Sequence, residues 1–293
     1  MSASSPVRRA FADLVRKADP DLDLARAALL IAQAEYPHLD LEAYLGRLDA
    51  LAAGVATRLA QAGTPWGSAD PPTVIAALNG VLFGDLGFHG NPDDYYDPRN
   101  SLLNEVLDRR TGIPITISLV YMEVAARLGL RLFGIGMPGR FLVQYPGQDG
   151  GGPHPHSGEL FIDPYAGGAL LTRADCADHF RNLYGPDFTF APEHLTPLTR
   201  HQILARLLGN LKAIYLRAHD YARAVVIVDR LVLVQPAAIW ELKDRGMLYY
   251  RLGGFVAALR DLQRYLQHDP DAEDAALIAY YVQQCQYLLL SKN

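Results

Sequence analysis

Cysteine and histidine are the side chains most able to act as nucleophile, base or metal ligand, and the chain offers few in useful groups. Cys176 and Cys285 are its only two cysteines, far apart and each in a helix-like stretch. Such spacing is typical of a reduced compartment and not of a disulfide framework. His154 and His156 lie in a loop rich in Gly and Pro, with no third ligand at a diagnostic spacing. We expect this loop to be a surface loop.

Asp93, Asp94 and Asp97 form the densest acidic group, and carboxylates of this kind can hold a hard cation. They stand beside Pro and Asn, however, and Asp-rich turns of this composition are commonly just solvated. We therefore expect no metal and no cofactor.

The overall charge excludes several classes of ligand. The chain has 293 residues, 50% of them hydrophobic and 20% charged, with a net charge of −5 at pH 7. No stripe of Lys and Arg is interleaved with aromatic residues, so we expect no nucleic-acid partner. Residues 1–19 lack the apolar run of a signal peptide, and no later run approaches the length of a membrane span. The sequence predicts a cytoplasmic protein that does not enter a membrane.

The elements that must position any site fall into three groups. Apolar residues recur every three or four positions in the first group, which predicts a helical segment over residues 1–86. Residues 113–128 form a strongly apolar run closed by Gly129, which indicates a buried helix. Three short alternating or apolar runs follow it and predict strands. The helices of the first group are expected at 22–36, 41–59 and 72–86, and the strands at 133–137, 141–145 and 160–162.

The last third of the chain contains an internal repeat. Six residues recur, identical or similar, 34 positions later, which is the period of a helix-turn-helix repeat. Two full units are fewer than the roughly three usually needed for independent stability, so helices at 198–208 and 275–290 are expected to support them. The matched pairs are Tyr215 and Tyr249, Tyr221 and Phe255, Ala224 and Ala258, Val228 and Leu262, Leu231 and Tyr265, and Pro236 and Pro270.

Repeat arrays bind extended peptides or helices on the face formed by the first helix of each unit. Exposed cationic residues expected on these helices are Lys212, Arg217, Lys243 and Arg251, which we predict to be the partner-binding residues. The alternative is that this face is covered by the protein's own domains, so that the repeats serve as a structural brace.

Six nearly contiguous stretches outside the repeats resemble the transglutaminase-like superfamily. Within it, the chain is similar to the bacterial Sir-B-type family, which joins such a domain to C-terminal tetratricopeptide repeats; the string Asp244-Arg245-Gly246 extends the match into the repeats. The resemblance implies an α+β fold with a papain-like core at 87–195, followed by an all-α repeat section at 196–293. The matching stretches are Tyr95–Ser101, Leu103–Leu107, Gly112–Ile115, Arg127–Leu130, Pro138–Val143 and Phe161–Pro164.

Active members of this superfamily place a cysteine at the start of the central helix, a histidine on the next strand and an aspartate on the one after. Here the cysteine position falls at or near Pro114, and the histidine position holds Arg140, which cannot accept a proton. Asp163 retains the third position. Thr116 and Ser118 are substitute nucleophiles at best, because a hydroxyl without a neighbouring base is weak.

Three functions remain open at this point. The favoured one is a non-catalytic interaction or regulatory protein, with Arg140 and Asp163 paired by a charge-assisted hydrogen bond that holds two strands together. The second is a hydrolase or acyl-transferase that uses noncanonical cleft residues. The third is a sensor in which Arg140 anchors a small anionic ligand.

Overall fold

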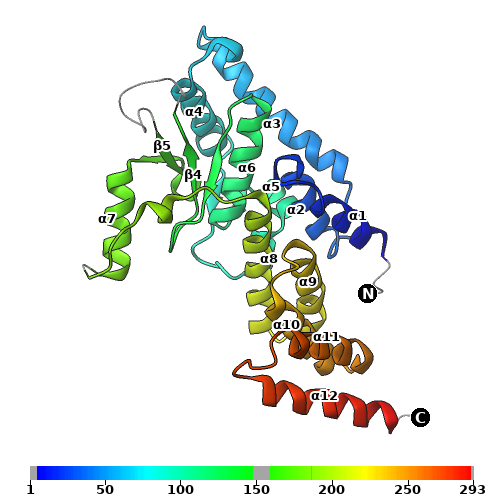
Figure 1. Cartoon of the computed structure of the whole chain (residues 1–293). Coiled ribbons are helices and arrows are strands. Elements are labelled where there is room, and N and C mark those ends of the chain that lie inside the picture. Colours follow the sequence, from blue (N-terminus) through cyan, green and yellow to red (C-terminus); the bar gives the residue numbers. More distant parts are fainter. Residues whose placement is uncertain (1–4, 148–158, 186, 292–293) are drawn as a thin grey trace. The chain divides into compact units, whose positions relative to one another are not determined.

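A computed structural model describes residues 5–147, 159–185 and 187–291, and their contacts divide the chain into two compact units (Figure 1). The first, here called the core unit, comprises residues 23–203. The second, the repeat unit, combines described residues of 1–22 with those of 204–293. The predicted domain boundaries, at 1–86, 87–195 and 196–293, differ from the boundaries of these two units. It stays a prediction, because compactness alone does not test which segments fold independently.

The helices of the core unit start at well-defined caps. The side chains of Asp23, Asp40 and Asp70 accept backbone N–H bonds at the starts of α2, α3 and α4, satisfying donors that a helix start leaves open. The helices expected over residues 22–86 are therefore confirmed. The bounds are α2 Leu24–Ala32, α3 Leu41–Gln61, α4 Pro71–Asn79, a π-helical turn Gly80–Asp85, α5 Leu103–Arg109, α6 Pro114–Arg127 and α7 Arg173–Tyr184.

The strands form one four-stranded sheet and one short parallel pair. The three expected strands are confirmed as β3 Phe133–Ile135, β4 Leu142–Tyr145 and β5 Leu160–Asp163. A fourth strand, β6 Ala169–Leu171, was not foreseen; it pairs with β5, so the antiparallel order is β3-β4-β5-β6. The parallel pair joins β1 His89–Gly90 to β2 Thr111–Gly112. Helices and an antiparallel sheet together make the α+β fold that the sequence predicts.

Helix α6 is the buried centre of the core unit, as expected. Most of its side chains are buried, and it packs against β3 and β4. On the other face of the sheet, Leu142 and Phe161 lie in one hydrophobic cluster with Cys176 of α7. Side chains alternate along a strand, so Asp163 points to the same face as Phe161. The sheet thus lies between α6 and α7 (Figure 1).

The repeat unit is all-helical. The two helical hairpins predicted from the 34-residue period are present, and Ala224 and Ala258, at equivalent positions, are both fully buried. Buried small residues let paired helices approach closely. Helix α1 lies within the predicted helical segment at 1–86, although no individual helix was expected at its position, and it packs on α9 through the fully buried Phe11. The bounds are α1 Pro6–Val15, α8 Arg200–Arg217, α9 Tyr221–Val234, α10 Ile239–Arg251, α11 Phe255–His268 and α12 Ala275–Leu290.

In the described residues, no helix has both the length and the apolar character required to cross a bilayer.

Candidate functional site

The predicted contact between Arg140 and Asp163 is confirmed. Arg140 Nη1 donates to Asp163 Oδ2 over 2.6 Å. Asp163 is the last residue of β5, whereas Arg140 lies in the turn before β4 and not on the strand itself. That turn depends on Gly139, whose φ of 75° is a left-handed value that suits glycine. The other carboxylate oxygen of Asp163 accepts the N–H of Ala166, so the carboxylate also caps the following turn.

A third residue, His179 of α7, completes this cluster and was missed by the sequence analysis. Arg140 Nε donates to His179 Nε2 over 3.1 Å, which requires the imidazole to be neutral at that nitrogen. Burial and, secondly, the Arg140 charge lower the pKa of His179 below its ordinary value, while Asp163 opposes this. No spacing could have indicated His179, because it lies 39 residues beyond Arg140 on a helix outside the matched strings.

The proposed substitute nucleophiles are held inside the fold. Thr116 is fully buried, and its hydroxyl donates to the backbone oxygen of Asn100 over 2.7 Å while accepting the N–H of Ile113 over 3.0 Å. Ser118 is also fully buried, with its hydroxyl 3.5 Å from the backbone oxygen of Phe141. Thr116 therefore acts as a cap of α6, a role that explains its position without any chemistry.

Pro114 is the first residue of α6, and Ile113 is its N-cap. Proline suits this position because its missing N–H has no intrahelical partner there and its φ is already helical. Pro114, at the start of α6, therefore has a hydrocarbon side chain without a nucleophilic atom.

The thiol nearest to the cluster is that of Cys176, and it is unsuited to catalysis. Cys176 is fully buried, and burial raises its pKa to about 11. A thiol acts as a nucleophile through its thiolate, which is scarce at neutral pH under these conditions. Arg140 cannot act as a base, and the Nε2 lone pair of His179 is already engaged. The arrangement therefore ties a turn, a strand end and a helix together.

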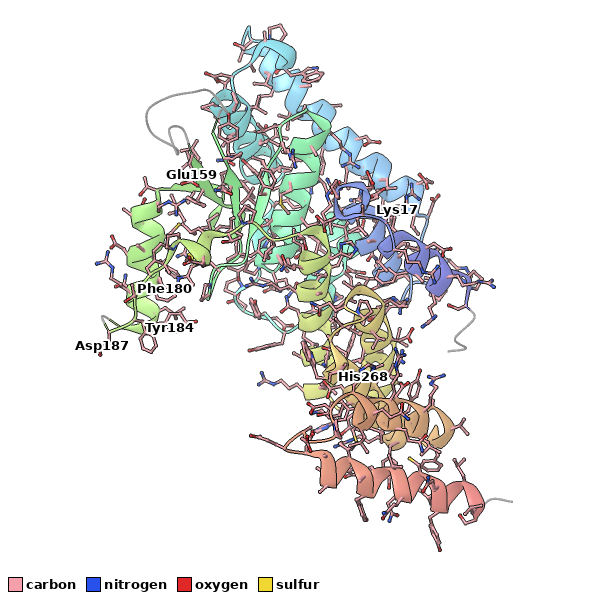
Figure 2. All side chains as sticks on the ribbon, in the orientation of Figure 1. Lys17, Glu159, Phe180, Tyr184, Asp187 and His268 are labelled. Carbon is pink, nitrogen blue, oxygen red and sulfur yellow. The ribbon has the colours of Figure 1, made fainter. Side chains whose placement is uncertain are left out.

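Helix α7, which carries His179, also carries an aromatic pair. Phe180 and Tyr184 lie one turn apart on α7, with ring centroids 4.8 Å apart (Figure 2). The helix is fixed at its start by an ion pair over 3.0 Å between Arg173 and Glu159, at the beginning of β5. Arg140 keeps 33% of its side-chain surface exposed, whereas Asp163 keeps 6%. The cation of the pair is thus partly open to water and the carboxylate is not.

In the acidic turn that contains Asp93, Asp94 and Asp97, the Asp97 carboxylate is bonded to a neighbouring arginine. Asp97 is buried and accepts hydrogen bonds from the backbone and side chain of Arg99. Within the part of the chain that the structure describes, no three His, Cys, Asp or Glu side chains are grouped to hold a metal ion. His154 and His156 lie outside the described residues.

Two of the predicted binding residues are engaged in ion pairs. Lys212 lies 2.8 Å from Glu241 and 2.5 Å from Asp244, and Lys243 lies 2.6 Å from Asp274. These pairs join α8 to α10 and α10 to the start of α12, so both lysines brace the repeat.

Arg251 donates to the hydroxyl of Tyr221 over 2.7 Å, while Arg217 is exposed near the end of α8. The assignment of all four predicted residues, Lys212, Arg217, Lys243 and Arg251, to a partner surface stays a prediction.

The fold defines an α+β domain followed by helical repeats. A family model described as the transglutaminase-like superfamily matches residues 42–209, and a tetratricopeptide-repeat model matches residues 211–283. The chain belongs to the transglutaminase-like superfamily. No solved structure matches it significantly.

Relatives with the same layout occur in bacteria. The chain is 37% identical to a UPF0162 protein of Xylella fastidiosa over 263 residues, covering 89% of each chain. It is 30% identical to a UPF0162 protein of Pseudomonas aeruginosa, covering 88% of each. A human relative, F-box only protein 21, is 31% identical over 222 residues, which cover 72% of this chain and 34% of that protein.

Proposed function

We propose that this protein is a non-catalytic interaction or regulatory protein of the cytoplasm, in which a degenerate transglutaminase-like core accompanies a partner-binding repeat section. The observation that carries the proposal is the state of the three triad positions. Pro114 offers no nucleophile, Arg140 offers no base, and Asp163 is bonded to Arg140 over 2.6 Å. The tetratricopeptide-repeat match supports a protein partner.

The hydrolase or acyl-transferase alternative requires a hydroxyl beside a base. Thr116 and Ser118 are fully buried and their hydroxyls contact backbone groups, so neither has the exposed, activated geometry that this chemistry needs. A positioned base contributes about 10²–10⁴ in rate, and its loss alone argues against an efficient enzyme.

The sensor alternative requires Arg140 to hold a small anion. Two edges of its guanidinium already donate, to Asp163 and to His179. An incoming anion would have to compete with a carboxylate that is almost fully buried beside it. The geometry therefore favours a structural role for Arg140.

Two measurements test the proposal. The purified chain is assayed for hydrolysis of amide and ester substrates and for glutamine-to-amine transfer, and we expect no turnover above a heat-inactivated control. Turnover that disappears on Thr116→Ala or Ser118→Ala would refute the assignment as a non-enzyme. In parallel, proteins that copurify from the native cell are purified and mixed with the chain, and we expect at least one to form a stoichiometric complex on size exclusion. If none does, the interaction role is wrong.

A further inference from the structure

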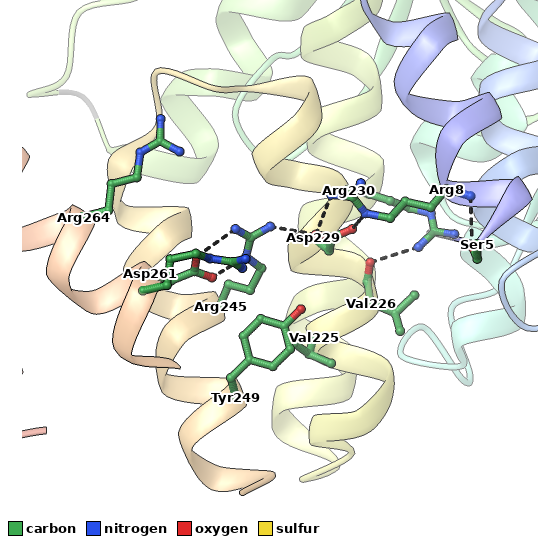
Figure 3. A pocket seen from close by; sticks show the side chains of 11 residues that line it. Ser5, Arg8, Val225, Val226, Asp229, Arg230, Arg245, Tyr249, Asp261 and Arg264 are labelled. Carbon is green, nitrogen blue, oxygen red and sulfur yellow. Dashed lines mark hydrogen bonds and ion pairs between the residues drawn. The ribbon is translucent and has the colours of Figure 1, made fainter. Parts of the chain in front are cut away.

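The repeat unit contains a cavity of about 350 Å³ that is unusually rich in arginine. It lies among α1, α9, α10 and α11, and Figure 3 shows it from close by. Five arginines line it: Arg8, Arg230, Arg245, Arg260 and Arg264. Two carboxylates, of Asp229 and Asp261, are the acidic groups of the lining.

Both carboxylates are already neutralised by a ladder of ion pairs. Arg245 lies at its centre, with Nη1 2.7 Å from Asp229 and Nε 2.6 Å from Asp261. Its Nη2 makes a further bond of 3.1 Å to Asp261, so that contact is bidentate. Arg8 of α1 donates to both carboxylate oxygens of Asp229, over 2.5 and 3.0 Å, and Arg260 lies 3.2 Å from Asp261. These ion pairs connect α1, α9, α10 and α11 around the cavity. The lining keeps an excess of positive charge.

That excess is three charges, since five arginines face two aspartates. The chain as a whole carries −5, so the cavity is a local exception to an acidic protein. A concave surface of one sign focuses the field and attracts ligands of the opposite sign. The lining therefore has the charge of an anion-binding site.

The repeat itself produces part of this arrangement. Arg230 of α9 and Arg264 of α11 are 34 residues apart, so they occupy equivalent positions in the two repeat units. Equivalent positions point to the same face of a stacked array. Arg230 is buried and donates to the backbone oxygen of Val226. Arg264 is exposed and makes no hydrogen bond or ion pair with any residue that the structure describes, and Figure 3 shows its side chain extending from α11.

We propose that this cavity binds an acidic segment of a protein partner, with a carboxylate held by Arg264 of α11 at the exposed edge of the positively charged lining. Guanidinium groups match carboxylates in planar shape and charge. Val225, Val226 and the ring of Tyr249 add apolar wall to the cavity, which suits the stems of acidic side chains. This inference rests on the proposed function, because it names the chemistry of the partner that the repeat section would bind.

The volume of the cavity favours a peptide over a small inorganic anion as its ligand. The cavity has room for roughly ten water molecules at about 30 Å³ each, so one tetrahedral oxyanion would fill less than half of it. A peptide segment can place two carboxylates and an apolar stem in the same space. The site also differs from the predicted one, because Lys212, Lys243 and Arg251 lie on the first helices of the repeat units and none lines this cavity.

The test measures binding of a fluorescein-labelled EELEE peptide to the full chain by fluorescence anisotropy at low salt. A QQLQQ peptide controls for charge, and a C-terminally amidated EELEE shows whether side chains or the terminal carboxylate bind. We expect saturable binding of EELEE, and Arg264→Gln should weaken it about tenfold, as expected for one charge-assisted contact. Arg264→Glu should weaken it further. Neither variant should lower the melting temperature, because Arg264 is exposed and forms no hydrogen bond or ion pair with a described residue.

A matched variant locates the site. Arg16→Gln removes an exposed charge just after the end of α1 and should leave the affinity within about twofold. The inference is overturned if EELEE does not bind, if Arg264→Glu has no effect, or if Arg16→Gln weakens binding as much as Arg264→Gln. It is also overturned if inorganic phosphate at micromolar concentration displaces the peptide, which would indicate a small-anion site. In each case a partner complex found by copurification would still support the interaction role, so the two failures are distinguishable.

Discussion

The unequal burial of Arg140 and Asp163 predicts that their removal has unequal costs. Arg140→Met leaves the Asp163 carboxylate, 6% exposed, without its partner cation. Water cannot reach it, so the change should cost about 3–5 kcal/mol of unfolding free energy, the usual cost of breaking a buried pair. Asp163→Asn leaves Arg140, 33% exposed, which water can still solvate. Its cost should be about 1–2 kcal/mol, near that of one charge-assisted hydrogen bond.

The double variant sharpens this prediction. With both charges removed, no unpaired ion remains, and Arg140→Met/Asp163→Asn should be more stable than Arg140→Met alone by about 1–3 kcal/mol. Such a gain on adding a second substitution distinguishes an ion pair from two independent contacts. Simple loss of packing would make the double variant the least stable of the three.

Urea unfolding can follow the core unit separately from the repeats. The chain has two tryptophans, Trp66 in the core unit and Trp240 in the repeat unit. In a Trp240→Phe background, Trp66 fluorescence reports the core unit, and the midpoint and slope give the free energy. Equal costs for Arg140→Met and Asp163→Asn, or a larger cost for Asp163→Asn, would refute the argument from burial.

Three further outcomes are expected. Arg245→Met should destabilise the repeat unit by up to about 3–5 kcal/mol, since the buried Asp261 keeps only its 3.2 Å contact with Arg260, and Arg245→Met/Asp261→Leu should recover most of the loss in urea unfolding followed at Trp240. Because burial lowers the pKa of His179, the folded state binds fewer protons than the unfolded state between that pKa and about 6.5. Stability should rise with pH through this window, and His179→Gln should remove that rise. Cys176, with a pKa raised by burial from 9.0 to about 11, should react with a thiol reagent at pH 8 about a hundredfold more slowly in the native than in the denatured chain.

Much of the fold could be predicted from local pattern. The central helix was recognisable because residues 113–128 are apolar over more than a strand's length, and proline at its start and glycine after its end mark its limits. Strand β6 was missed because Ala169–Leu171 is three residues long, and its pairing depends on β5 and not on its own sequence.

The site could be predicted only in part, for a physical reason. The contact between Arg140 and Asp163 followed from neighbouring strands, because antiparallel register brings β4 and the end of β5 together. His179 reaches the same point from a helix whose placement depends on packing across the sheet, which no local pattern encodes. Thr116 was proposed as a nucleophile because its position in a cap is visible only once the helix start is known.

The arginine cavity shows what a repeat period can and cannot predict. The 34-residue offset predicts that Arg230 and Arg264 share a face, and both line the same cavity. The offset does not predict that Arg8 and Arg245 form ion pairs with Asp229 of α9 and Asp261 of α11, because Arg8 and Arg245 lie on other helices. The pairing does not change the net charge, because five arginines against two aspartates leave the lining positive whichever of them pair. It decides which cation remains available. Arg8 and Arg245 hold Asp229, and Arg245 and Arg260 hold Asp261, so Arg264 keeps its charge for a ligand.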